Sequence, residues 1–249
     1  SFYRKTYVQN QILGRALLEK IGARDDCRVV AGVDREAGNV GGIPVYAGFA
    51  ELPCKGVIID FSSPAGAVTA AQYGAENGLP CVICSTGLSK EDEAVLEAAS
   101  AKVPIFRSAN MSVGVNVLIE LARQATKILG GEFDIEIVEK HHHNKLDAPS
   151  GTAKMLFSAI QEVRPDAVAH CGRAGEGKRE KNEIGISAVR GGTIVGDHTI
   201  IFAGHDEVIE IKHSAQSREI FANGAVKAAK FLADVQEAGM YNMSQLVNE

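Results

Sequence analysis

The sequence has no long apolar stretch. None of its 249 residues lie in a run of about 18 apolar residues, which is roughly the least that a membrane-spanning helix needs. Its first residues, SFYRKTYVQNQ, also lack the apolar centre that is typical of a signal peptide. We therefore expect a cytoplasmic protein that does not interact with a membrane.

An excess of positive charge is also absent. The chain has 26 Lys and Arg residues against 31 Asp and Glu residues, a formal net charge of -5. Nothing is therefore left over to neutralise a phosphate backbone, which argues against nucleic acid as a partner. Apolar residues make up 45% and charged residues 23%, as in ordinary globular proteins, and the length suits one large or two modest domains.

Cysteine is scarce. An odd number of cysteines spread over a chain of this size favours free thiols in a reducing compartment. Cys81 and Cys84 form a C-x-x-C pair, which can bind zinc or carry redox chemistry. Their segment, PCVICSTG, has the pattern of a buried strand, on which side chains three positions apart point to opposite faces. We therefore favour two buried core residues over a ligand pair. The five cysteines are Cys27, Cys54, Cys81, Cys84 and Cys171.

The first half of the chain alternates between two patterns. Short apolar, β-branched segments are separated by alanine-rich segments with helical character, and a helical pattern over 12–21 precedes the first clear strand. Repeated strand–helix units of this kind predict an α/β fold, with a parallel sheet covered on both faces. The predicted strands are 28–34, 56–61, 80–84 and 103–106.

Small or polar residues follow each of these four strands. In parallel α/β sheets, ligands bind beyond the carboxyl ends of the strands, so these clusters favour a cofactor crevice. Ordinary loop chemistry is the alternative. The clusters are Asp34-Arg35, Phe61-Ser62-Ser63, Cys84-Ser85-Thr86-Gly87 and Ser108-Ala109-Asn110-Met111.

The second half has a different pattern. After a helical stretch over 113–131, FDIEIVEK alternates strictly between apolar and polar residues, and three more strand-like segments follow. These predict a mixed or antiparallel sheet with one face in water, before a final helix over 217–239. We therefore expect a Rossmann-type dinucleotide-binding domain of residues 1–112 plus 221–249. A mixed-sheet α+β domain of residues 113–220 would complete the chain.

The dinucleotide fingerprint G-x-G-x-x-G is incomplete. Gly14 takes the place of the third glycine, while Gln9 and Gln11 occupy the other two positions. The acidic residue of the fingerprint is present, since Asp34 ends the next strand, where a carboxylate can accept from ribose hydroxyls. Arg35 can pair with a 2′-phosphate. A solvent-exposed acid and base in a turn is the alternative for Asp34 and Arg35.

The stretch EKHHHNKLDAPSGTAK, residues 139–154, concentrates titratable groups beside a predicted helix. Ser150 is a natural N-cap, so the backbone N–H groups of Gly151 and Thr152 should form an anion site at the helix N-terminus. The histidines and Lys145 add positive charge, and a histidine can move a proton near neutral pH. We therefore predict a pocket for a small ligand with carboxylates.

Two other interpretations of this stretch are open. A zinc site would need converging ligands, but adjacent histidines on an extended chain point in alternate directions and no cysteine lies near. The second interpretation is a run of charged surface residues in contact with water.

The segment E-x-H-H-x-x-K-x-D-A-P-S-G-T-A, from Glu139 to Ala153, resembles the signature of the 4-hydroxy-tetrahydrodipicolinate reductase family of bacterial lysine biosynthesis. Further segments that resemble the family are DFSSP, STG, SANMSVGVN, VRGGTIVGDHT and FANGAVKAA. The resemblance extends over nearly the whole chain from Gly14 onward. It implies a Rossmann-type domain that uses NADH or NADPH, and a mixed-sheet domain that binds a small dicarboxylate and forms a homotetramer.

The resemblance also implies roles for individual residues. His141 matches a proton donor and acceptor, and Lys145 matches a proton donor. His142, Gly151 and Thr152 match residues that hold the dicarboxylate. The implied cofactor residues are Gly14 in the first turn, Asp34 and Arg35 at the adenosine ribose, and Cys84, Ser85, Thr86, Ser108, Ala109, Asn110 and Met111 along the nicotinamide half.

The N-terminal segment departs from the family pattern. The first loop of the family resembles G-x-x-G-R-M-G, and aligning Gly14 with its last glycine places Val8 and Gln11 at the other glycine positions. Bulky side chains there should obstruct a close approach of pyrophosphate to the backbone. A non-catalytic protein that binds a dicarboxylate but has an impaired dinucleotide loop is therefore the second functional hypothesis.

Overall fold

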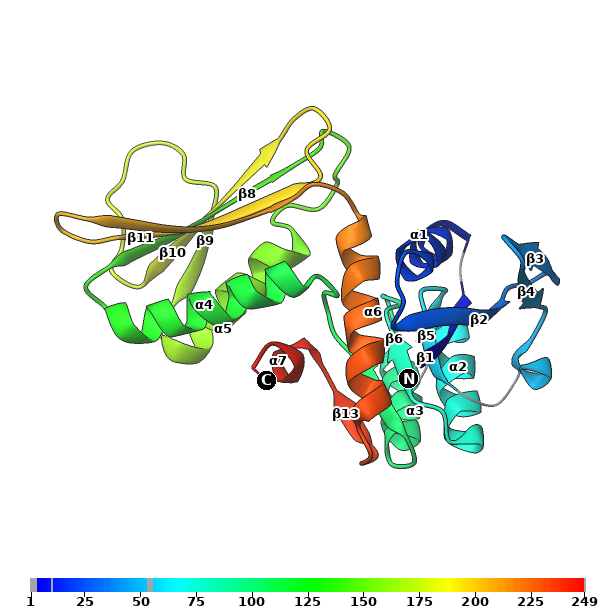
Figure 1. Cartoon of the computed structure of the whole chain (residues 1–249). Helices are drawn as coiled ribbons and strands as arrows, with labels where there is room; N and C mark the ends of the chain where they lie inside the picture. The colour runs from blue at the N-terminus through cyan, green and yellow to red at the C-terminus, as the bar shows by residue number, and fades with distance from the viewer. Residues whose placement is uncertain (1–3, 10, 53–55, 249) are drawn as a thin grey trace. The chain divides into compact units, whose positions relative to one another are not determined.

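The chain is divided into two compact units, shown in Figure 1. Unit 1 comprises Ser1–Ser112 and Glu219–Glu249, and unit 2 comprises Val113–Arg218. The computed structural model describes residues 4–9, 11–52 and 56–248, without the side chains of residues 4–9, 11–15 and 51. Within these ranges, no helix has the length and apolar character that crossing a membrane requires.

Unit 1 is built on an eight-stranded sheet with the order β13-β7-β6-β5-β1-β2-β4-β3. All neighbouring strands are parallel except β3, which is antiparallel to β4. The Rossmann-type parallel sheet expected from the sequence is therefore confirmed. Its strands are β1 (Arg4–Gln9), β2 (Cys27–Val33), β3 (Gly38–Val40), β4 (Ile43–Tyr46), β5 (Val57–Asp60), β6 (Cys81–Ile83), β7 (Pro104–Arg107) and β13 (Gly239–Tyr241).

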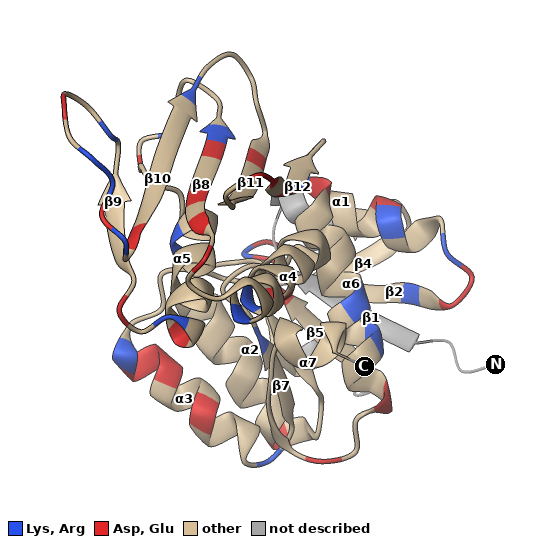
Figure 2. Cartoon of the chain, turned by 90° about the vertical axis from the view of Figure 1, so that its left-hand side faces the viewer, with Lys and Arg blue, Asp and Glu red and all other residues tan. Residues whose placement is uncertain are grey.

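The helices of unit 1 begin at residues suited to that position. Ser63 caps α2 by accepting a hydrogen bond from the Gly66 N–H, and Ser89 and Asp92 form a capping box at α3. The first turn of α3 is acidic (red in Figure 2), which complements the helix dipole. The helices are α1 (Gln11–Gly22), α2 (Pro64–Asn77), α3 (Lys90–Ser100), α6 (Glu219–Asp234) and α7 (Met243–Val247), with a 3-10 turn at Phe49–Glu51.

The two faces of this sheet pack against different helices. Ile58, Ile83 and Ile105 belong to a core that includes alanines of α2 and residues of α3. The intervening residues, such as Phe106, point to the opposite face, because successive side chains of a strand alternate. On that face the ring of Phe106 meets Phe231 of α6, with centroids 6.1 Å apart.

One glycine allows α6 to approach the chain after β7 closely. A Cβ atom on Gly224 would lie 1.7 Å from the backbone oxygen of Met111, a separation no side chain can tolerate. Gly224 is fully enclosed in the middle of α6, and Met111 is 4% exposed. The absence of a side chain at Gly224 is thus a packing requirement of unit 1.

The register of the sheet aligns the carboxyl ends of its central strands. Gln9 of β1 is level with Val33 of β2 and with Asp60 of β5. The row continues from Asp60 to Ile83 of β6 and on to Arg107 of β7. Because β1 lies between β2 and β5, the strand order reverses direction there, which is where doubly wound sheets bind ligands.

Unit 2 contains a five-stranded mixed sheet with the order β12-β11-β8-β10-β9. β8, β10 and β9 are parallel to one another, and β11 is antiparallel to both β8 and β12. This confirms the mixed sheet expected for the second half of the chain. The strands are β8 (Asp134–His141), β9 (Val168–Cys171), β10 (Glu183–Arg190), β11 (Gly196–Ala203) and β12 (Val208–Ala215).

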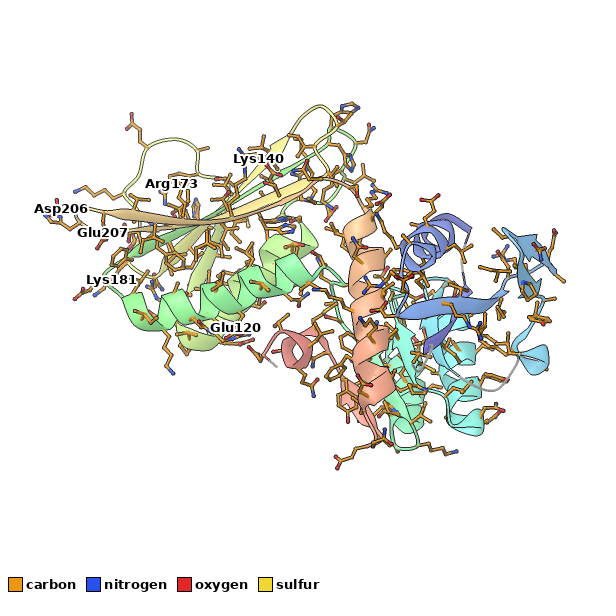
Figure 3. The ribbon with its side chains drawn as sticks, viewed as in Figure 1. Glu120, Lys140, Arg173, Lys181, Asp206 and Glu207 are labelled. Carbon is orange, nitrogen blue, oxygen red and sulfur yellow. The ribbon has the colours of Figure 1, made fainter. Side chains whose placement is uncertain are left out.

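Two helices, α4 (Val113–Leu129) and α5 (Gly151–Val163), pack against one face of the unit 2 sheet. Ile135 and Ile137 of β8 are fully buried in the same core as Leu156 and Ile160 of α5. The alternation of β8 continues to the end of the strand, so Glu139 and His141 are on this buried face as well. Lys140, which stands between them, is on the other face (Figure 3).

Candidate active site

In unit 1, the buried carboxylate of Asp60 joins two of the predicted cofactor loops. Asp60 ends β5 and accepts hydrogen bonds from the Ser62 hydroxyl, from the Ser62 N–H at 2.9 Å and from the Ser85 hydroxyl at 2.5 Å. Its side chain is fully buried. Burial raises the pKa of Asp60, and the hydrogen bonds from Ser62 and Ser85 oppose that rise. Sequence reasoning missed this residue, although DFSSP contains it.

The loop after β6 is held from two sides. The Cys84 N–H donates to the Asp60 carbonyl at 2.8 Å, and Arg107 donates to the Ser85 carbonyl at 3.1 Å. Burial raises the pKa of the Cys84 thiol well above its ordinary value, so this cysteine is protonated and unreactive near neutral pH. Thr86 is exposed at the end of the loop. Cys27, Cys81, Cys84 and Cys171 are free thiols, and Cys54 lies outside the described residues.

The loop after β7 contains Ser108, Ala109, Asn110 and Met111. The Asn110 side chain accepts from the Ser112 N–H at 2.8 Å, which turns the chain toward α4. Ala109 is exposed and Met111 is buried against α6. Together with the loops after β5 and β6, this segment places small and polar side chains at the carboxyl edge of the sheet.

Asp34 follows β2 at the same edge. Its N–H donates to the Tyr46 carbonyl at 3.0 Å, and its carboxylate accepts from the Arg35 N–H at 2.7 Å. The Arg35 side chain is exposed. The strand β1 ends at Gln9 and α1 begins at Gln11, so Gly14 lies in the first turn of that helix. Asn10, between the strand and the helix, lies outside the described residues.

In unit 2, Glu139 is the centre of a buried polar network. Arg190 donates to both carboxylate oxygens, each at 2.8 Å. The Ser150 N–H donates to Oε1 at 3.0 Å, and Nδ1 of His141 lies 2.6 Å from Oε2. Burial alone would raise the pKa of Glu139, but the hydrogen bonds from Arg190 and His141 outweigh it and the pKa is lowered. Glu139 is therefore an anion in the folded protein.

His198 of β11 extends this network. Its Nε2 is 2.9 Å from the Ser150 hydroxyl, and its ring meets that of His141 edge-on at a centroid distance of 5.2 Å. Burial, and then the proximity of His141, lower the pKa of His198 to about 4. His198 is thus neutral near pH 7. The Ser150 hydroxyl also accepts from the Ala153 N–H and so caps α5. Ser150 therefore connects the polar network to the start of the helix.

Lys145 lies in the loop between β8 and α5. Its ammonium group is 2.8 Å from the Asp147 carboxylate, an ion pair that lowers the pKa of Asp147. Its N–H donates to the His142 carbonyl at 3.1 Å, which closes a turn. Gly191 and Gly192 brace the loop through backbone hydrogen bonds to His141 and His143.

Gly151 and Thr152 are the first two residues of α5. Apart from its chain neighbours and the backbone of α5, no atom of the described residues lies within 4 Å of the position that a Cβ on Gly151 would occupy, so the backbone there is open to a ligand. The N-terminal end of a helix favours an anion. Desolvation lowers the pKa of His142, and the positive charge of Arg218 adds to this effect.

The structure thus gathers His141, His142 and Lys145 in the segment that leads from β8 into the first turn of α5. Sequence reasoning missed three functional residues of unit 2: Glu139, Arg190 and His198. The signal for Glu139 was its spacing, since residues two apart on a strand share a face. Arg190 and His198 come from strands far along the chain, and the sequence alone does not show their pairing. Among the described residues, no group of three or more metal-ligand side chains occurs.

Two sequence models of one family match the chain. The model for the N-terminus of dihydrodipicolinate reductase matches residues 12–111, and the model for its C-terminus matches residues 114–247. The first match begins at residue 12, so the residues of β1 lie outside it.

The similar proteins are named as reductases. The 4-hydroxy-tetrahydrodipicolinate reductase of Clostridium tetani is 46% identical over 242 residues, with 96% of this chain and 94% of that protein covered. The one from Caldanaerobacter subterraneus subsp. tengcongensis is 49% identical over 243 residues, with 96% of each covered. A dipicolinate-bound dihydrodipicolinate reductase from Paenisporosarcina sp. TG-14 has the same fold, with a TM-score of 0.81, 20% identity and coverage of 97% and 98%. By sequence, this chain belongs to the dihydrodipicolinate reductase family.

Proposed function

We propose that the protein catalyses the NADH- or NADPH-dependent reduction of 4-hydroxy-tetrahydrodipicolinate to tetrahydrodipicolinate, in which the 4-hydroxyl group leaves as water, in the diaminopimelate pathway of lysine biosynthesis. One observation carries the proposal: the buried Glu139 carboxylate holds both His141 and the N-cap Ser150 of α5, in a chain of this family that contains His141, Lys145, Gly151 and Thr152. Gly151 and Thr152 begin α5 directly after Ser150, which supports this assignment.

The substrate-binding part of the site is cationic. One carboxylate of the substrate binds the N-terminal N–H groups of α5 at Gly151 and Thr152, where the helix dipole favours an anion. Lys145 provides positive charge and His142 provides a hydrogen-bond donor beside it. These groups also stabilise the negative charge that develops on the ring during reduction.

Proton transfer belongs to Lys145 and His141. Lys145 has three donor hydrogens, and its backbone N–H ties it into the same turn as His142. His141 is buried, and one of its ring nitrogens is hydrogen-bonded to Glu139. Lys145 therefore donates a proton to the reduced ring, and His141 takes part as donor and acceptor.

The carboxyl edge of the unit 1 sheet suits a dinucleotide. Asp34 has its carboxylate at the end of β2, where it can accept from ribose hydroxyls, and the Asp60–Ser62–Ser85 cluster shapes the loops after β5 and β6. Cys84, Ser85, Thr86 and the segment from Ser108 to Met111 would line the nicotinamide half. NADH or NADPH, when bound, supplies the hydride for the reduction. The turn before Gly14 lacks the remaining glycines of the fingerprint, so we expect weaker binding of the pyrophosphate there.

The oligomeric state and the compartment are also part of this proposal. Val189 of β10 and Val208 of β12 are exposed large apolar residues on the face of the unit 2 sheet opposite the helices α4 and α5. Contact with further copies of the chain would bury them, which supports a homotetramer. Free thiols at Cys27, Cys81, Cys84 and Cys171 support a cytoplasmic location.

A turnover assay with the purified chain tests the proposed function. With freshly prepared 4-hydroxy-tetrahydrodipicolinate and NADH or NADPH, the absorbance of the nicotinamide at 340 nm should fall with time. The kcat should lie in the range common for enzymes, ~1–10³ per second. Binding of pyridine-2,6-dicarboxylate by calorimetry without any turnover would instead support the non-catalytic binding protein.

Substituting Arg35 by Ala should discriminate between the two cofactors. The exposed guanidinium next to Asp34 can pair with a 2′-phosphate, and a hydrogen bond to a charged group contributes about 1.5–3 kcal/mol. We expect the KM for NADPH to rise roughly tenfold or more and the KM for NADH to change less than about threefold. Lys102→Ala, an exposed lysine elsewhere in unit 1, is the control. Equal losses for both cofactors would show that Arg35 does not bind the phosphate.

A further inference from the structure

We propose that Glu139, held in place by Arg190, is the positioning residue that fixes the tautomer and the orientation of His141, so that Nε2 is the ring nitrogen that exchanges a proton. This inference rests on the proposed function. It assigns a role to two residues. Glu139 contacts His141 directly, and Arg190 contacts Glu139.

The Glu139 carboxylate is held so that it cannot rotate freely. Oε1 accepts from Arg190 at 2.8 Å and from the Ser150 N–H at 3.0 Å. Oε2 accepts from Arg190 at 2.8 Å and faces Nδ1 of His141 at 2.6 Å. The two-pronged contact with the planar guanidinium fixes the plane of the carboxylate. The side chain is fully buried, so water does not compete for these hydrogen bonds.

This geometry determines which nitrogen of His141 carries a hydrogen. An ionised carboxylate only accepts hydrogen bonds, so Nδ1 of His141 has to donate to Oε2. In the neutral ring, Nε2 is then the acceptor, and it is the nitrogen where a proton is gained or lost. On that side, a Cβ added to Gly196 would lie 3.1 Å from Nε2. Glycine at 196 therefore leaves space beside the reacting atom.

The charges around His141 come from several elements. Glu139 of β8 supplies a negative charge in direct contact, and Arg190 of β10 lies behind that carboxylate. His198 of β11 meets the ring edge-on and is neutral near pH 7. His142 and Lys145 follow in the loop. Loss of the Glu139 charge would therefore remove the anion that lies against the His141 ring.

The substitution Glu139→Gln tests the proposal with little change of volume. The amide can still accept from Arg190, but its NH₂ group then faces Nδ1 and favours the opposite tautomer of His141. We expect kcat to fall about 10²-fold, the KM for the dicarboxylate substrate to change less than about threefold, and the acidic limb of the kcat/KM pH profile to move to lower pH. Glu136→Gln is the matched control, because Glu136 is a carboxylate of the same strand that pairs with Arg179 instead. It should leave kcat and the pH profile unchanged.

A measurement on the unaltered protein does not depend on whether the variant folds. Nitrogen-15 NMR of the histidine rings, with the His141 signal assigned by its loss in His141→Gln, should show Nδ1 protonated and Nε2 unprotonated in the neutral ring. An Nε2-protonated ring would overturn the proposal, as would a Glu139→Gln variant with normal kcat and an unshifted pH profile. If the chain proves not to reduce the substrate, the proposed function fails, while the NMR result still decides the tautomer of His141.

Discussion

Replacing Lys145 by Ala lowers kcat by about 10²–10⁴-fold, the range that a positioned proton donor contributes, while the affinity for NADH changes by less than about threefold. Lys145 belongs to unit 2, in the loop between β8 and α5, whereas the residues proposed to bind the cofactor belong to unit 1. The lysine also adds positive charge beside the site for the dicarboxylate. We therefore expect the KM for the substrate to rise as well.

Steady-state kinetics and a fluorescence titration with NADH measure the two effects separately. Lys154→Ala is the control, because Lys154 is an exposed lysine one turn into α5 and should leave kcat within about twofold of the unaltered protein. Normal turnover in Lys145→Ala would exclude Lys145 from the mechanism. A loss of NADH affinity as large as the loss of kcat would point to general misfolding.

The substitution Gly224→Ala should destabilise unit 1 by about 3 kcal/mol or more, although glycine to alanine in the middle of a helix ordinarily stabilises by roughly 0.5–1 kcal/mol. The reason is the 1.7 Å separation between the added Cβ and the Met111 backbone oxygen. Neither α6 nor the chain after β7 can move away without opening the buried core around Phe106 and Phe231. Since Met111 ends the segment proposed to line the nicotinamide half, NADH binding should weaken too.

Urea unfolding followed by circular dichroism gives the change in the free energy of unfolding. Lys227→Ala serves as the control, because Lys227 is exposed on the same helix and alanine is the better helix former there. A variant at Gly224 that unfolds at the same urea concentration as the unaltered protein would show that α6 packs less closely on Met111.

Much of the fold could be predicted because its signals are local. The predicted strands 28–34, 80–84 and 103–106 correspond to β2, β6 and β7 within one residue at either end, because each is a short apolar run bounded by turn residues. The small elements were missed. β9 consists only of exposed residues and β13 has three residues, so neither has a strand-like alternation of apolar residues that can be detected.

The central position of β1 was also beyond sequence reasoning. The segment of β1, RKTYVQ, has a weak strand pattern, yet it pairs with both β2 and β5. The candidate site was predictable where its residues are contiguous, as from Glu139 to Thr152. The pairing of Arg190 with Glu139 joins β10 to β8 through sheet register, and that information is not present in the spacing of the residues.

Unit 1 is formed by two separate parts of the chain, which has a consequence for the synthesis of the protein on the ribosome. The strands β5, β6 and β7 are complete when the ribosome has passed Arg107, but α6, which packs against Phe106, begins only at Glu219. At translation rates of about 5–20 residues per second, all of unit 2 has to be made in between, which takes roughly 5–20 s. During that time the face of β5, β6 and β7 that later packs against α6 is uncovered. A chaperone that binds exposed apolar segments would therefore find its target on the half-made sheet, before the last helix is synthesised.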